Sequence, residues 1–338
     1  MGFVFLPEIN CLFMKKILGI GNALVDILIR IDRDSLLDQL NLPKGSMQLV
    51  NKLRSDEILA LLEANEKSFA AGGSAANTIH GLGMLGAPTG YIGVIGEETL
   101  GNSFEADMLA AGVRPYLIRS NTETGRAITL ISSDSERTFA TCLGAAVELT
   151  PSNIRQLAPE VFPNYDYLHI EGYLVQNHEL IQTAVKLAKA NGLKVSLDLA
   201  SYNVVEANHA FLEEIVKNEV DIIFANEEEA KAFTGHEPEP ALHHLAHFCE
   251  VAIVKTGSKG SLIKSGEVVT EIGVIPVHPI DTTGAGDLYA AGFLYGHSMG
   301  WPLERCGRAG ALLAGNIIEE LGAKMPLSRW DAVKKAIQ

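Results

Sequence analysis

The stretch DTTGAGD at residues 281–287 runs directly into the apolar helical pattern LYAAGFLYGHSM at 288–299. Gly284, Ala285 and Gly286 have little or no side chain, so successive backbone N–H groups can converge on an oxyanion, and the helix dipole adds partial positive charge. Asp287 follows at once, where its carboxylate could accept a proton from an attacking hydroxyl group. An ordinary glycine-rich turn with an Asp at the helix start explains the stretch equally well when it is taken alone. Other motifs must therefore decide between an anion site and a turn.

Apolar runs of strand length precede this motif and alternate with helical patterns. The runs lie at 15–20, 90–96, 166–171, 194–199, 220–225 and 251–255. They are typical of parallel strands that are buried on both faces. Strand followed by helix, repeated along the chain, predicts an α/β fold with a doubly wound, mainly parallel sheet and helices on both faces.

Two stretches, 24–50 and 113–147, interrupt this alternation with patterns that resemble exposed β-ribbons. Strands inserted without crossover helices most simply form a small sheet that stands off the main domain. We therefore expect a large α/β nucleotide-binding and catalytic domain made of 14–23, 51–112 and 148–338, and a small β lid made of 24–50 and 113–147. Such a small sheet suits closure over an active site and also dimerisation, and the two roles are compatible.

The net charge restricts the partners. The 41 acidic side chains exceed the 27 Lys and Arg side chains, which gives a formal charge of −14. This charge repels nucleic acid and anionic lipid, so neither is expected as a partner. An anionic nucleotide must instead be held locally, by helix N-termini, a bound cation or a few basic side chains.

The cysteines and the N-terminus indicate the compartment. The four cysteines, Cys11, Cys142, Cys249 and Cys306, show no CxxC pairing, which favours a reducing cytoplasm. In residues 1–13 the apolar run is broken by Pro7 and precedes its positive charges, which is not the order of an export signal. Because Met14 begins a clean strand pattern, we interpret residues 1–13 as a non-native or disordered upstream extension.

Two further motifs follow early strands. In GNALVDI at 21–27, Asn22 and Asp26 lie just past a buried strand, where ligands bind in doubly wound folds. In AGGSAAN at 71–77, Gly72 and Gly73 permit close approach of a ligand to the backbone, and Asn77 offers both a donor and an acceptor. A solvated Asp and a tight strand-to-helix turn are the alternatives. Leu24 occupies the last position of a would-be GxGxxG, so a dinucleotide fingerprint is absent.

Two more motifs end later strands. In NEEEA at 226–230, Asn226 and Glu229 could order magnesium-bound water around phosphates, although an acidic first helical turn is the commoner explanation. The glycines of KTGSKG at 255–260 suit a loop around a nucleotide, or a simple hairpin turn. No GxxxxGK[ST] or GxSxG occurs, which argues against a P-loop enzyme and an α/β-hydrolase.

A histidine cluster near Cys249 is a weaker candidate. His243, His244 and His247 include an i, i+4 pair, but no second ligand pair or HExxH context accompanies them. We interpret them as side chains on a partly exposed helix.

The five motifs, in the order GNALVD, AGGSAAN, NEEE, KTGSKG and DTTGAGD, resemble the ribokinase or PfkB carbohydrate kinase family over nearly the whole chain. The resemblance implies a Rossmann-like sheet with a β lid, Asp287 as catalytic base, and an anion hole at Gly284, Ala285 and Gly286. It also implies ATP and Mg²⁺ as cofactors, with Asn226 and Glu229 in the magnesium and phosphate motif, and a monovalent cation such as K⁺ held by Asp281. The remaining ATP-binding residues implied are Lys255, Thr256, Gly257, Gly260 and Asn316.

Within that family, GNALVDI and AGGSAAN look most like the adenosine kinase branch. In ERTFATCLGAA, Arg137 matches a lid arginine of that branch that approaches the transferred phosphate, a task suited to a planar guanidinium. Gln48, Tyr173 and Leu174 match positions of the nucleoside pocket.

We therefore expect a cytoplasmic kinase that moves the ATP γ-phosphate to a primary hydroxyl, most simply the 5′-hydroxyl of adenosine or a related purine nucleoside. Ribose, fructose or another sugar is the alternative acceptor, and a non-catalytic ligand-binding scaffold is a more distant alternative. The protein is expected to be a monomer, or a homodimer that associates through the lid.

Overall fold

The computed structural model describes residues 14–134 and 136–337, and its largest element is a sheet of nine strands. Residues 1–13, interpreted above as an extension, lie outside the described part. The strand order is β14-β13-β12-β11-β10-β9-β1-β5-β6. The strands of this sheet are β1 Ile17–Ile20, β5 Thr89–Gly96, β6 Val113–Ser120, β9 Tyr167–Glu171, β10 Lys194–Asp198, β11 Ile222–Asn226, β12 Val251–Lys255, β13 Ser261–Ser265 and β14 Val268–Ile272.

All neighbouring strands from β12 to β6 are parallel, and the hairpin strands β13 and β14 extend the sheet in antiparallel fashion. The six apolar runs of the sequence form β1, β5, β9, β10, β11 and β12, as predicted. Each run is mainly apolar because helices cover both faces, so successive side chains point into two different cores. In β11, for example, Ile223 packs in one core and Phe224 in the other.

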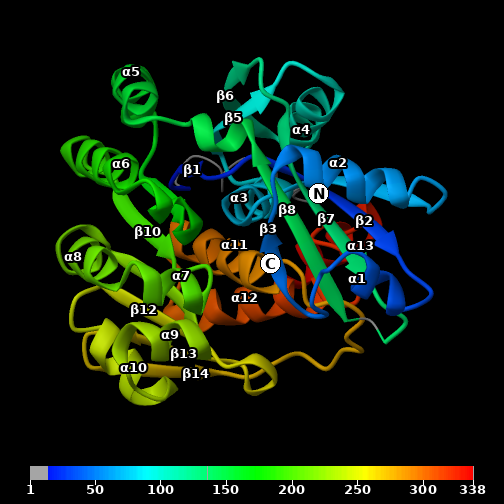
Figure 1. Ribbon diagram of the computed structural model, residues 1–338. Coiled ribbons are helices and arrows are strands. Elements are labelled where there is room, and N and C mark those ends of the chain that lie inside the picture. The colour runs from blue at the N-terminus through cyan, green and yellow to red at the C-terminus, as the bar shows by residue number, and fades with distance from the viewer. Residues whose placement is uncertain (1–13, 135, 338) are drawn as a thin grey trace, which may run out of the picture.

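The helices form a layer on each side of the large sheet (Figure 1). One layer consists of α3 Ser74–Met84, α4 Thr99–Ala110, α11 Ala285–Ser298, α12 Leu303–Ile317 and α13 Leu327–Ile337. The other consists of α5 Pro151–Val161, α6 His178–Ala190, α8 His209–Glu219, α9 Glu227–Thr234 and α10 Pro238–Leu245, with the short helix α7 Tyr202–Ala207. Short 3₁₀ turns are η2 Ala145–Glu148, η3 Phe162–Asn164, η4 Gly172–Gln176 and η5 Gly257–Lys259. No helix in the described residues combines the length and apolar character needed to cross a membrane.

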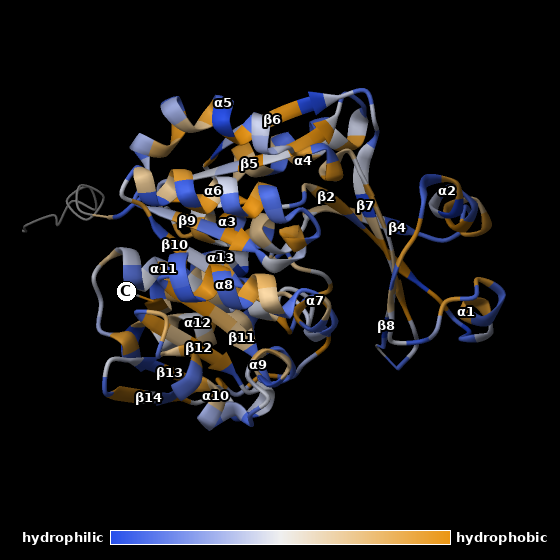
Figure 2. Cartoon of the chain, turned by 60° about the vertical axis from the view of Figure 1, so that its left-hand side comes forward, coloured by the Kyte–Doolittle hydropathy of each residue, from blue (hydrophilic) through white to orange (hydrophobic). Residues whose placement is uncertain are grey.

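A second sheet of five strands stands beside this body (Figure 2). Its order is β3-β8-β7-β2-β4, with β2 Leu24–Arg30, β3 Met47–Leu49, β4 Lys67–Gly72, β7 Thr124–Ile131 and β8 Arg137–Gly144. Helices α1 Ser35–Gln39 and α2 Lys52–Leu61 pack on the side of this sheet that faces away from the body. Ile27, Ile29, Ile128 and Leu130 form a separate small core with these helices. The opposite face of the sheet is left to face the body.

The predicted boundaries of the small sheet were wrong in two places. The segment 113–120 was expected in the lid, but it forms β6 and pairs in parallel with β5 at the edge of the large sheet. Conversely, 51–72 was assigned to the large domain, but α2 and β4 belong with the small sheet, where β4 pairs with β2. The alternating pattern of 113–120 arises because β6 is an edge strand and is only half covered.

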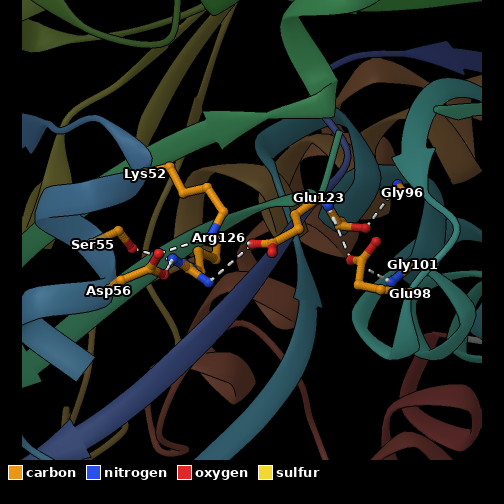
Figure 3. A network of polar contacts seen from close by, with 9 residues as sticks. Lys52, Ser55, Asp56, Gly96, Glu98, Gly101, Glu123 and Arg126 are labelled. Carbon is orange, nitrogen blue, oxygen red and sulfur yellow. Dashed lines mark hydrogen bonds and ion pairs between the residues drawn. The ribbon is translucent and has the colours of Figure 1, made fainter. Parts of the chain in front are cut away.

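The base of the small sheet is fixed to the large domain by a polar network (Figure 3). Glu98, at the start of α4, accepts hydrogen bonds from the backbone of Gly101 and Thr124, at 3.3 and 3.0 Å. The Thr124 hydroxyl accepts from the backbone N–H of Gly96 at 2.9 Å. Because Gly96 ends β5 and Thr124 begins β7, these bonds position the strand that leads from one sheet into the other.

Candidate active site

A cleft of about 1080 Å³ lies between the small sheet and the carboxyl ends of the large sheet's strands. The last residues of four adjacent strands line it: Glu171 of β9, Asp198 of β10, Asn226 of β11 and Lys255 of β12. Carboxyl ends of parallel strands share one edge, and this edge is where doubly wound folds bind ligands. Polar and charged residues from motifs that are distant in the sequence therefore lie together in this cleft.

Asp287 lies in the cleft at the first turn of α11, and α3 holds its carboxylate from both sides. Its Oδ1 accepts from the Ser74 hydroxyl at 2.7 Å, and its Oδ2 accepts from Asn77 Nδ2 at 3.0 Å. Burial raises the pKa of Asp287 to about 6, against the lowering effect of these two hydrogen bonds. The group is thus ionised at neutral pH, and its basicity suits proton abstraction from a hydroxyl.

The turn that precedes Asp287 lines the cleft at the start of α11. Gly284 adopts φ 71°, a left-handed conformation that favours glycine, and α11 begins at the next residue. A Cβ at Gly286 would lie 3.0 Å from Lys255 Nζ, so the ammonium group sits directly over the turn. The Ala285 N–H donates to the Thr282 carbonyl at 3.2 Å, which leaves the next N–H groups of the first helical turn for a ligand.

A charged cluster adjoins the anion turn. Lys255 Nζ donates to Asp198 Oδ2 at 2.9 Å. Burial disfavours the charge of Lys255, but Asp198 and Glu229 raise its pKa above the usual range. Burial raises the pKa of Glu229, which is 2% exposed, to about 7. Because its pKa is raised, the ammonium group of Lys255 stays protonated and offers positive charge to a phosphate.

Asn226 and Glu229, the predicted magnesium residues, form a capping box at the start of α9. Glu229 accepts from the backbone N–H and the Nδ2 of Asn226, both at 2.7 Å, and its own N–H donates to Asn226 Oδ1 at 2.8 Å. Their oxygens line the cleft but already hold hydrogen bonds. This donor set fits contact with a hydrated Mg²⁺ through water. In the described residues no group of three or more His, Cys, Asp or Glu side chains is arranged to hold a bare metal ion, the histidines near Cys249 included.

On the opposite side of the cleft, Asp26 projects from β2. Its cross-strand neighbour on β7 is Ala127, which pairs in turn with Thr141 on β8, so all three point to the cleft face of the small sheet. A Cβ at Gly72 would lie 2.5 Å from the Asp26 carboxylate, so only glycine admits that group here. Burial raises the pKa of Asp26 to about 6, although Lys324 and Arg137 lower it.

Asn22 is positioned by Glu171, a buried carboxylate that the sequence patterns did not identify. Its backbone N–H and its Nδ2 both donate to Glu171 Oε1, at 2.9 and 2.6 Å. Glu171 Oε2 accepts from the Ala75 N–H at 2.9 Å, so one carboxylate joins β1, β9 and the start of α3. Gly73 is required beside them, because its φ is 99° and a Cβ would lie 2.1 Å from the Asn22 carbonyl oxygen.

Asn77 has one unused hydrogen-bonding atom. The side chain is 5% exposed and donates to Asp287, yet its Oδ1 has no partner among the described residues. A buried acceptor without a donor is costly, and a ligand hydroxyl would satisfy it. The atom belongs to the amide group that is hydrogen-bonded to Asp287.

The small sheet adds an apolar wall that the sequence analysis missed. Phe139, Thr141 and Leu143 alternate along β8 and all line the cleft. Leu24, Met47 and Leu49 line it as well, beside the predicted residue Gln48. The period-two spacing on β8 was the available signal.

Several predicted site residues lie outside this cleft. Tyr173 lines it, but Leu174 packs in the core and lines a neighbouring cavity. Gly257 lines it, whereas Thr256 and Gly260 bond to each other at 2.8 Å in the turn after β12. Asn316 Nδ2 donates to the Leu312 carbonyl within α12. Arg137 and Asp281 pair with each other near the cleft.

Comparison with known proteins shows the family of this chain. The model of the pfkB family carbohydrate kinases matches residues 50–330. The crystal structure of adenosine kinase from Sinorhizobium meliloti is 34% identical, covers 96% of this chain and 99% of that chain, and has a TM-score of 0.86. A probable sugar kinase protein from Rhizobium etli CFN 42 is 32% identical, with the same coverage and TM-score.

The adenosine kinase of Schizophyllum commune is 27% identical over 350 residues, 94% of this chain and 98% of its own length. These relatives support the resemblance to the adenosine kinase branch and the predicted ribokinase-like fold. The chain therefore belongs to the pfkB carbohydrate kinase family and is a phosphotransferase that acts on an alcohol group.

Proposed function

We propose that this protein is an ATP-dependent nucleoside kinase that transfers the γ-phosphate to the 5′-hydroxyl of adenosine or a related purine nucleoside. The observation that carries the proposal is the division of one cleft into two unlike halves. A polar half holds Asp287, Lys255 and the glycine turn, and an apolar half is formed by Phe139, Leu143 and Leu24 around the Asp26 carboxylate. A nucleoside has the same division, with hydroxyl groups at one end and a flat base at the other.

The acceptor is oriented by hydrogen bonds at its sugar. Asp26 offers two acceptor oxygens, which suit the adjacent hydroxyls of a ribose. Asn77 Oδ1 has no donor within the described part of the chain and lies next to the base Asp287, so it accepts from a sugar hydroxyl. The purine then packs on the side chains of β8, which would be left partly uncovered by a free sugar.

The phosphate end supplies charge and position. Phosphoryl transfer depends on alignment and charge neutralisation more than on covalent help. The N–H groups at the start of α11 and the ammonium group of Lys255 face the γ-phosphate. Asn226 and Glu229, which line the cleft with Asp198, would hold Mg²⁺ through water, and the ion would supply positive charge to the phosphates. Asp287 takes the hydroxyl proton on a carboxylate oxygen while Ser74 and Asn77 hold it in place.

Closure of the small sheet completes the site. Asp26 and the wall of β8 belong to that sheet, whereas Asp287 and Lys255 belong to the body. A bound nucleoside contacts both and draws them together. Water is then excluded from the γ-phosphate, which suppresses hydrolysis of ATP.

The test is an assay that couples ADP release to a signal, run separately with adenosine, inosine, ribose and fructose. We expect kcat/KM for the best nucleoside to exceed that for either free sugar by at least about tenfold, or roughly 1.4 kcal/mol of transition-state stabilisation. The Rhizobium etli neighbour, described as a probable sugar kinase, makes a sugar the second candidate. A free sugar that is turned over tenfold better than any nucleoside would establish that second candidate instead.

A further inference from the structure

Two residues to which the family resemblance gives separate tasks contact each other in this chain. Arg137, the first residue of β8, matches an arginine that approaches the phosphate, and Asp281, which begins the DTTGAGD motif, matches a residue that holds a monovalent cation. The structure places a guanidinium nitrogen of Arg137 against Asp281 Oδ1. Both side chains are buried, with exposed fractions of 10% and 1%. The contact joins the small sheet to the catalytic turn.

The carboxylate of Asp281 does not fit an additional cation. Its Oδ1 also accepts from the Thr283 N–H at 2.6 Å, and its Oδ2 accepts from the Gly322 N–H at 2.7 Å. Both oxygens are therefore engaged by donors, and the guanidinium cancels the negative charge. A K⁺ ion within bonding distance would have to lie beside that guanidinium and would be repelled by it.

The surroundings contain a second resident cation. Lys324 follows Gly322 by two residues, and its buried Nζ lies 3.2 Å from Asp107 Oδ2. Burial lowers the pKa of Arg137 to about 10, which still leaves the guanidinium protonated at neutral pH. Burial lowers the pKa of Lys324, although Asp107 raises it. The region behind the catalytic turn thus contains two basic side chains of its own.

We propose that the Arg137 guanidinium replaces a monovalent cation as the permanent counter-ion of Asp281, so that this kinase works without K⁺. Asp281 holds the Thr283 N–H and thereby shapes the turn that leads to Asp287. Arg137 acts through Asp281 and is a positioning residue that ties the small sheet to this turn. The activity part of this inference rests on the proposed kinase function, whereas the ion-pair part does not.

The experiment measures thermal unfolding and kinase activity in potassium, sodium and tetramethylammonium chloride at equal ionic strength, with and without nucleotide. For the natural sequence we expect Tm to agree within about 1 °C and kcat within about twofold across the three salts. Arg137→Met removes the guanidinium and exposes the Asp281 carboxylate. In that variant potassium should raise Tm by roughly 2 °C or more over tetramethylammonium, because binding to the folded state alone stabilises it.

Two variants control for a general loss of stability. Arg126→Met removes a buried arginine from the neighbouring strand β7, where it contacts Ser55 and Asp56 in the polar network of Figure 3. It should lower Tm equally in all three salts. The double variant Arg137→Met with Asp281→Asn should lose the potassium response. Arg137→Lys keeps the positive charge, so its Tm should remain insensitive to potassium. This variant provides the test if Arg137→Met does not fold.

Four results would overturn the inference. The first is a potassium-specific effect on the natural protein, either a rise in Tm of more than about 2 °C or a rise in kcat of more than about twofold. The second is a potassium effect that appears only with bound nucleotide, because Arg137 would then leave Asp281 on loading. The third is a folded Arg137→Met protein without a potassium response. The fourth is a potassium response in Arg137→Lys. If no acceptor is phosphorylated at all, the proposed function fails, while the unfolding data still decide the ion pair.

Discussion

The two sheets contribute unlike surfaces to one cleft. The large sheet presents charged and polar groups at strand ends, such as Asp198 and Lys255, together with Asp287 on the helix beside them. The small sheet presents Asp26 within the apolar side chains of β8 and β3. In the function proposed here, the large sheet performs the phosphoryl transfer and the small sheet selects the acceptor. Substitutions in the large sheet should therefore lower kcat, and substitutions in the small sheet should weaken binding of the acceptor.

The largest effect is expected from Asp287→Asn, which keeps the shape of the side chain and removes its basic oxygen. Loss of a general base typically costs about 10²- to 10⁴-fold in rate, so kcat should fall by that factor while both KM values change little. Steady-state kinetics on protein verified by circular dichroism provides the measurement. A folded variant that binds both ligands and keeps more than about a tenth of kcat would return Asp287 to the role of a helix-start residue.

Asp26→Ala comes next, and it should separate the two ligands. The variant lacks the carboxylate that accepts hydrogen bonds from two sugar hydroxyls, and those hydroxyls are left unsatisfied. The affinity for the acceptor substrate should therefore fall by roughly 10- to 100-fold. Nucleotide affinity should stay nearly unchanged, because the phosphate end belongs to the large sheet. Calorimetry with each ligand measures both values. Equal losses of affinity would place Asp26 in a structural role.

Phe139→Ala tests the apolar wall with a smaller effect. Removal of the ring uncovers one face of the base, and kcat/KM for adenosine should fall by roughly tenfold. Turnover of ribose, which does not reach this wall, should change less than about twofold. Thr138→Ser, a change on the opposite face of the same strand, is the control. A parallel loss for both acceptors would mean that Phe139 supports the fold and does not contact the base.

The smallest effect concerns pH, where activity should change more than stability. The pKa values of Asp26 and Asp287 are raised to about 6, and those of Glu171 and Glu229 to about 7, each mainly by burial. Between about pH 5 and pH 7 these four carboxyl groups bind more protons in the folded state than in the unfolded state, which favours the folded state as pH falls. Four histidines act in the opposite direction, because burial lowers the pKa of His169 to about 4 and also lowers the pKa of His80, His244 and His297. As pH falls from 7 to 5, kcat/KM should decline as Asp287 is protonated, whereas Tm should change little.

Scanning calorimetry and kinetics over this range provide both curves. Asp26→Asn should lower Tm at pH 5 relative to pH 7 more than in the natural protein, since one carboxyl group that takes up a proton on acidification is removed. A variant whose Tm follows pH as in the natural protein would show that Asp26 takes up no proton in this range.

The sequence was most informative where the function depends on backbone form. Gly73 and Gly284 stand at positive φ, and Gly72 must admit the Asp26 carboxylate, so these positions carry their constraint in their own residue type. Asp287 could be assigned because it adjoins such a position. These are local requirements, and a sequence displays local requirements directly.

The sequence was least informative where a role depends on distant partners. Glu171 and Asp198 each end an apolar run, and a single carboxylate there looks like a solvated strand end until Asn22 or Lys255 is placed against it. The ion pair between Arg137 and Asp281 joins two motifs, and the two residues are 144 positions apart in the sequence. Strand β4 was missed because KSFAAG has an exposed, mixed pattern and gains its place only by pairing with β2.

A competition assay tests the division of labour between the two sheets most directly. Equal concentrations of adenosine and ribose react with ATP in one tube, and phosphorus NMR resolves the two phosphomonoesters, whose initial ratio equals the ratio of the kcat/KM values. With the natural sequence we predict at least about ten molecules of nucleoside monophosphate for each ribose phosphate, and with Phe139→Ala a ratio about tenfold lower. With Asp287→Asn both products should form about 10²- to 10⁴-fold more slowly. An excess of ribose phosphate, or a ratio that Phe139→Ala leaves unchanged, would contradict the account.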